Sequence, residues 1–145
     1  MEEILQITVF QIGARFFGME IDQVRGIVEN VGMLEASNIY PDNIIGILPV
    51  GDDVIPVIDL CAYLDIEPPA SYEGISFLLF QKQKSRVAFP VNRVEKYCNI
   101  SRDCLNPVSP VAVSTAVRSF RWIANMEGRL VPILDTQWLM ERVGN

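Results

Sequence analysis

Apolar and polar positions alternate in short runs along the whole chain. Runs rich in Val, Ile and Phe recur about every ten residues and are separated by Gly, Pro, Asn and Asp, which is the pattern of strands joined by turns. This pattern predicts an all-β protein, with strands at residues 7–12, 15–21, 54–60, 75–80, 86–91 and 130–134. Short helices are predicted only at 60–64, 114–120 and 136–143.

The chain contains an internal repeat. The segment VIPVIDL at 54–60 reappears 76 residues later as LVPILDT at 130–136, with identical Pro and Asp positions. Phe10-Gln11 recurs 70 residues later as Phe80-Gln81, and 19–24 resembles 89–94 at the same interval. The order and spacing of these segments agree in both halves. We therefore expect two copies of one small SH3-like barrel, in tandem and related by a pseudo-twofold.

The repeated Pro and Asp have structural interpretations. Pro56 cannot donate to a β-ladder, which places it in an edge strand or a bulge. Asp59 and Asp135 each follow a strand and precede a predicted helix, so each is expected to cap that helix with its side chain. Because barrels of this size are individually marginal, we expect the two copies to share apolar surface as one domain over 1–145. One lobe is expected at about 7–64 plus part of the chain ends, and the other at about 75–140.

Composition argues against some classes of function. The formal charge is -6, whereas nucleic-acid binding draws its affinity from clustered Lys and Arg, so no nucleic-acid partner is expected. The first residues are acidic, unlike a secretory signal, and no apolar run approaches the roughly 18 residues of a membrane span. These features predict a cytoplasmic protein that does not insert into a membrane.

The residues that usually carry catalysis are missing. The chain has no His, no phosphate-binding loop of the form GxxxxGK and no GxGxxG. Cys61, Cys98 and Cys104 form no CxxC pair, so we expect no metal and three reduced, mostly buried thiols. The adjacent Asp52 and Asp53 are expected in an exposed hairpin turn. The sequence thus predicts a protein that is not an enzyme and holds no cofactor.

Residues 40–47 (YPDNIIGI) and 54–60, together with Phe10 and 19–27, resemble the CheW family of chemotaxis adaptors over nearly the whole chain. The resemblance implies two five-stranded barrels about a pseudo-twofold. It also implies a non-catalytic scaffold that couples methyl-accepting chemotaxis receptors to the regulatory domain of a CheA-type histidine kinase.

The resemblance also carries candidate sites. Ile21 and Val24 are expected to face the kinase, although both are equally suited to the core. The receptor-facing residues are expected to be Ile47, Leu48, Val50 and Gly51. The family usually has Asn-Leu-Arg-Gly before its Pro-bearing strand, whereas this chain has Pro-Val-Gly-Asp at 49–52 and so lacks the turn Arg.

Two alternatives remain open at this stage. The chain is also compatible with a divergent CheW-like protein of another chemosensory system, for pili or development, that binds a kinase or self-assembles without receptor contact. The other alternative is a small-ligand sensor that uses the crevice between the lobes.

Overall fold

A computed structural model describes residues 4–29, 34–35, 44–68, 75–82, 84–107 and 120–143. The helix predicted at 114–120 lies outside these residues except at its last position, where a strand begins. The described elements are β1 (Ile4–Ile12), β2 (Arg15–Glu20), η1 (Ile21–Gln23), β3 (Val24–Val28), β4 (Leu34–Glu35), β5 (Ile44–Val50), β6 (Asp53–Ile58), α1 (Leu60–Leu64), β7 (Ser76–Lys82), β8 (Ser85–Val91), β9 (Arg93–Ser101), η2 (Arg102–Cys104), β10 (Leu105–Pro107), β11 (Phe120–Met126), β12 (Arg129–Leu134) and α3 (Thr136–Val143).

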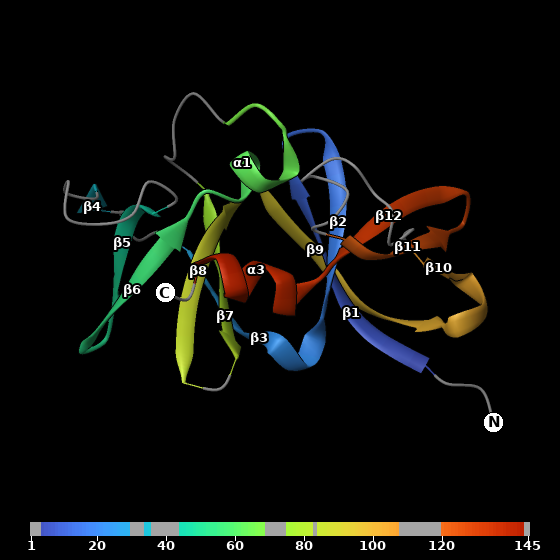
Figure 1. Cartoon of the computed structure of the whole chain (residues 1–145), viewed down its shortest axis with the longest axis horizontal. Helices are drawn as coiled ribbons and strands as arrows, with labels where there is room; N and C mark the ends of the chain where they lie inside the picture. The colour runs from blue at the N-terminus through green and yellow to red at the C-terminus, as the bar shows by residue number, and fades with distance from the viewer. Residues whose placement is uncertain are drawn as a thin grey trace.

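The described strands form two sheets with equivalent order. One sheet runs β10-β11-β12-β2-β1-β9, and the other, read from its far edge, runs β4-β5-β6-β8-β7-β3. Each strand of one sheet corresponds to the strand six numbers away in the other sheet, so that β1 corresponds to β7 and β6 to β12. Figure 1 shows the two groups of strands at opposite ends of the molecule, with α1 and α3 near its middle. The predicted all-β, two-lobed SH3-like fold with a pseudo-twofold is therefore confirmed.

The lobes differ from the expected ones in their makeup. The hairpin β1–β2 pairs with β9 and β12 of the second half, whereas the hairpin β7–β8 pairs with β3 and β6 of the first half. The expected lobe boundaries at about 7–64 and 75–140 therefore do not describe the sheets. Among the described residues, each sheet has six strands instead of five, and the shortest of them, β4 and β10, lie at edges.

Pro56 and Pro132 lie at equivalent places, but in inner strands. Pro56 is opposite Ile47 of β5, and Pro132 is opposite Ile123 of β11. On its other side β6 meets β8 only at the pair Val57–Ala88, in parallel orientation. Because this second contact is one residue pair long, the missing N–H of Pro56 interrupts no extended ladder. The expectation of an edge strand or bulge for Pro56 was wrong for that reason.

Only one of the two repeated Asp residues caps its helix. Asp135 accepts a hydrogen bond at Oδ1 from the backbone N–H of Trp138, at 3.1 Å, as predicted. Asp59 occupies the same position before α1, but its side chain makes no capping bond. Its backbone, at φ -85° and ψ 88°, departs from the extended conformation typical of a capping residue. The predicted cap at Asp59 was therefore wrong.

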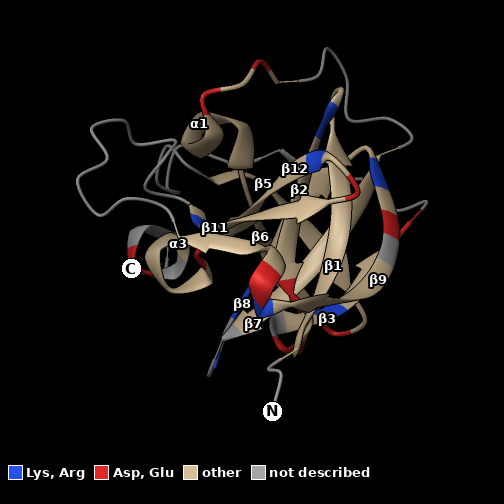
Figure 2. Ribbon diagram, turned by 90° about the vertical axis from the view of Figure 1, so that its right-hand side faces the viewer, with Lys and Arg blue, Asp and Glu red and all other residues tan. Residues whose placement is uncertain are grey.

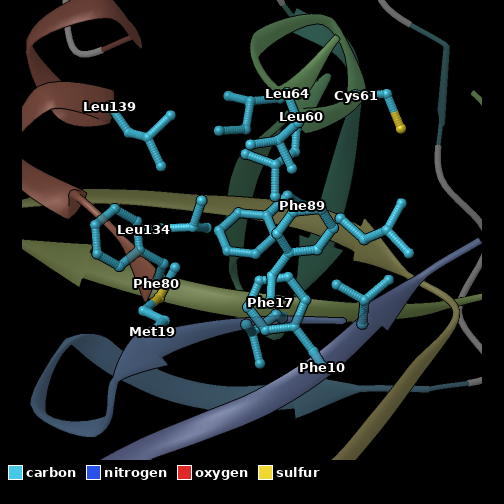
Figure 3. Close-up of a cluster of buried hydrophobic side chains, with 14 of the residues drawn as sticks. Phe10, Phe17, Met19, Leu60, Cys61, Leu64, Phe80, Phe89, Leu134 and Leu139 are labelled. Atoms are coloured by element: carbon cyan, nitrogen blue, oxygen red, sulfur yellow. The ribbon is translucent and has the colours of Figure 1, made fainter. Parts of the chain in front are cut away.

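The largest core cluster joins the two lobes. It contains buried side chains from both hairpins and from both helices, and Figure 3 shows them converging between α1, α3 and the strands. They include Phe10, Phe17, Met19, Leu60, Leu64, Phe80, Phe89, Leu134 and Leu139. A smaller cluster fills each sheet. The lobes thus share apolar surface, as their small size predicted.

The two parallel strand contacts join equivalent residues of the repeat, and the two residue pairs differ in which strand carries one methyl group. Gly18 of β2 lies opposite Ile133 of β12, whereas the equivalent residues Ala88 and Val57 pair in the other sheet. A Cβ on Gly18 would lie 2.6 Å from Cδ1 of Ile133, which is closer than real contacts allow. The smaller residue on one strand therefore compensates for the larger residue on its neighbour.

We expect Gly18→Ala to destabilise the protein by about 1–3 kcal/mol, because the added methyl overpacks against Ile133. Ile133→Val alone should cost about 0.5–1.5 kcal/mol. The double variant recreates the Ala–Val pair of the other sheet, so it should be more stable than the sum of the two losses predicts. Urea denaturation of all four proteins measures the coupling, and simple additivity would contradict the equivalence of the two contacts.

Candidate partner-binding surfaces

Ile21 lies on the surface at the start of η1, where β2 ends. It is half-buried and belongs to none of the three core clusters. It lines a cavity of about 420 Å³ together with Ile4 and Leu5 of β1, and the rim carries the carboxylates of Glu20 and Asp22. Ile4 itself is 60% exposed. Here the chain offers an accessible apolar site with an acidic rim.

Val24 has a different environment from that of Ile21, although both residues lie in the repeated segment 19–24. It begins β3, is half-buried, and packs against the central core cluster, as the equivalent Val94 does. Its side chain therefore supports the shared core. The structure separates the two candidate kinase-facing residues into a surface residue and a packing residue.

The hairpin β5–β6 carries the four residues expected to face a receptor. Ile47 is half-buried and lies opposite Pro56. Val50 is half-buried and packs against the core of its sheet, and Gly51 is exposed in the turn. Leu48 is fully buried in that core, so it cannot form part of an accessible surface. Leu48 was misassigned because alternate residues of a strand point to opposite faces.

The residue after the acidic turn forms an ion pair that the sequence did not predict. Residues 51 and 52 form the exposed turn, as predicted, and Asp53 begins β6. Asp53 forms an ion pair with Arg86 of β8, with Oδ2 and Nη1 2.5 Å apart. Val54 beside it is 60% exposed. No local motif links Arg86 to Asp53, because the contact depends on the pairing of β6 with β8.

All three cysteines are reduced thiols, but they are not equally buried. Cys61 is buried in the central core, Cys98 is half-buried and Cys104 is exposed. Burial, and then the nearby Asp59 carboxylate, raise the pKa of the Cys61 thiol. The expectation that these thiols are mostly buried holds for Cys61 and was wrong for Cys104, which lies in the short η2 turn.

The described ranges contain neither a candidate metal-binding cluster nor a candidate membrane-spanning helix. Within them, no three His, Cys, Asp or Glu residues are grouped so that they could hold a metal ion. Among the described helices, none has both the length and the apolar character that a membrane span requires.

Comparison with known proteins shows which family and which solved structure this chain is similar to. A family model described as CheW-like domain matches residues 6–144. Among solved structures, the crystal structure of the scaffolding protein TtCheW from Thermoanaerobacter tengcongensis is similar, with a TM-score of 0.82 and 22% sequence identity. The match covers 99% of this chain and 97% of that one. No curated protein matches the sequence.

Proposed function

The chain belongs to the CheW-like domain family, and we propose that it is a non-catalytic adaptor that couples chemoreceptors to a CheA-type histidine kinase. The observation that carries this proposal is the family match, which extends over residues 6–144 and so includes both lobes. The missing His and phosphate-binding loops support a binding role over a catalytic one.

For the kinase, we propose the surface at Ile21. Its half-buried side chain, the exposed Ile4 and the cavity between them provide an apolar contact that a partner can cover. Val24 lies next to this surface and holds β3 against the central core. We therefore assign binding to Ile21 and support of the surface to Val24.

For the receptor, we propose the outer side of the β5–β6 hairpin. Ile47 lies on this side, Gly51 lies in the turn, and the exposed Val54 extends the apolar character. Val50 packs against the core of the sheet, so its part would be to support the turn. Leu48 supports this hairpin from within the sheet. The altered turn at 49–52 then sets how strongly this chain binds a receptor.

The family turn can be restored by a paired change that has a precedent in the second half of the chain. Gly51 has φ +59°, a conformation that costs an L-residue about 1–2 kcal/mol, so Gly51→Arg alone should destabilise the hairpin. The equivalent turn of the second half has Glu127 at φ 56° followed by Gly128 at φ 86°. Gly51→Arg with Asp52→Gly reproduces this order of a side chain followed by glycine.

We expect this double variant to bind receptor several-fold more tightly while kinase binding stays unchanged, because the two proposed surfaces are separate. Co-sedimentation with receptor-containing vesicles measures the first effect, and titration with the kinase regulatory domain measures the second. Unchanged receptor affinity in a well-folded double variant would mean that the turn does not meet the receptor.

The proposed function as a whole is tested by titrating the protein with the regulatory domain of the CheA-type kinase from the same organism. We expect a stable complex of equal stoichiometry by calorimetry and size-exclusion chromatography. The absence of any complex would contradict the adaptor function. Nucleotide or ester hydrolysis that follows the protein through purification and is lost in variants would contradict the non-catalytic assignment.

A further inference from the structure

A cavity of about 500 Å³ opens at one end of the sheet that contains β1, β2 and β9–β12. Its floor consists of Val9, Ile100 and Val131, which are buried residues of that sheet's core cluster. Its walls come from β9, from η2 and from the turn between β11 and β12. An apolar floor with a few converging polar groups, in a cavity of this size, is typical of a small-molecule site.

Four charged side chains line the cavity. Two of them, Arg93 and Glu95, belong to β9, and Figure 2 shows both basic and acidic positions on this strand. Glu95 forms an ion pair with Arg129 of β12, whose Nη1 lies 3.6 Å from its Oε2. The Arg129 guanidinium also lies 4.1 Å from the centre of the Phe16 ring.

The other two charges are available to a ligand. Within the part of the chain that the structure describes, neither Arg93 nor Glu127 has an ion-pair partner. Arg93 comes from β9 and Glu127 from the β11–β12 turn, so one positive and one negative group line the cavity from different elements.

The internal repeat shows that the scaffold does not need the charge of Glu127. Glu127 has φ 56°, and the equivalent residue of the first half is Gly51 at φ 59°. Glycine adopts this conformation freely, whereas Glu is strained in it. The turn itself is held by Asn125, whose Oδ1 accepts a hydrogen bond from the Gly128 backbone N–H at 3.1 Å. A carboxylate at Glu127 is therefore present where the backbone favours glycine.

We propose that this cavity binds a small zwitterion, namely a free amino acid or a dipeptide with an aliphatic side chain. Arg93 would bind its carboxylate and Glu127 its ammonium group, while the aliphatic side chain packs against the half-buried Met126. Each charged group of the ligand then meets a side chain of opposite sign. This inference is independent of the proposed adaptor function.

Calorimetry and thermal unfolding with L-leucine, L-valine, L-methionine and leucyl-dipeptides test the proposal. N-acetyl-L-leucine and L-leucinamide each lack one of the two charges and serve as matched controls. Binding of the zwitterions, with a loss of about tenfold or more in affinity for both controls, is the expected result. If none of the zwitterions binds, or if the controls bind as well as leucine, the proposal is wrong.

Two variants separate binding from stability. Glu127→Asn creates an Asn-Gly turn, which suits positive φ, so the unliganded protein should melt at the same or a higher temperature. The same variant should lose the increase in melting temperature that leucine causes, and Arg93→Gln should lose it too. A leucine effect that survives in both variants would overturn the assignment of these two residues.

The thiols provide an independent readout. Cys98 and Cys104 line this cavity, and Cys104 is exposed, whereas Cys61 is buried in the central core. Bound leucine should slow the alkylation of Cys104 by iodoacetamide at least several-fold and leave the reaction of Cys61 unchanged. Equal rates with and without saturating leucine would show that leucine does not occupy the cavity.

Discussion

Phe89→Ala is expected to lower the free energy of unfolding by about 3–5 kcal/mol and to destabilise both lobes together. Phe89 is fully buried, and its ring centre lies 5.8 Å from that of Phe10 and 6.4 Å from that of Phe80. These rings come from both hairpins, and each hairpin belongs to a different sheet. Because a domain is stable by only about 5–15 kcal/mol, this loss is a large part of the total.

The two tryptophans measure whether the lobes unfold together. Trp122 packs against the core of one sheet, and Trp138 packs against the central cluster. In Phe89→Ala, tryptophan fluorescence and circular dichroism should follow one shared transition at lower urea. Phe16→Ala serves as the control, because Phe16 is only half-buried and lies outside the central cluster, so its loss should be smaller. Two separate transitions in the wild-type protein would contradict a shared core.

Ile21→Arg is expected to weaken binding of the kinase regulatory domain by about 30-fold or more, which corresponds to about 2 kcal/mol. The substitution places a charge within an apolar contact that the partner would cover. Because Ile21 lies outside the core clusters, the arginine can reach water in the free protein. Its free energy of unfolding should therefore change by less than about 1 kcal/mol.

Two further arginine variants serve as controls for Ile21→Arg. Val24→Arg should reduce the free energy of unfolding, because Val24 packs against the central core. Leu130→Arg, at a residue of β12 that is 65% exposed and does not line the cavity at Ile21, should change neither stability nor kinase binding. Kinase affinity that is normal in Ile21→Arg would remove Ile21 from the interface, whereas unfolding of that variant would place Ile21 in the core.

Much of the fold could be predicted because its signals are local. The alternation of apolar residues marked the strands, and the repeat of VIPVIDL marked two equivalent units. The exchange of hairpins between sheets could not be predicted. It depends on which partner Gly18 and Ala88 meet, and the repeat is compatible with pairing within or between the halves.

The candidate surfaces were harder to predict than the fold. An isolated apolar strand residue gives no sign of which face it occupies, so Leu48 and Ile47 looked alike although one is fully buried. Ile4 was missed because its exposure follows from the position of β1 beside η1. The special role of Glu127 became visible only when its φ was compared with that of Gly51.

The central claim is that this chain couples receptors to a kinase. The most direct measurement is autophosphorylation of the CheA-type kinase from the same organism, mixed with vesicles that contain its chemoreceptors. We predict that kinase activity in the receptor-bound fraction rises only when the wild-type protein is added, and that Ile21→Arg does not support this rise. Equal activity with and without the protein, at concentrations that saturate its binding to the kinase, would contradict the claim.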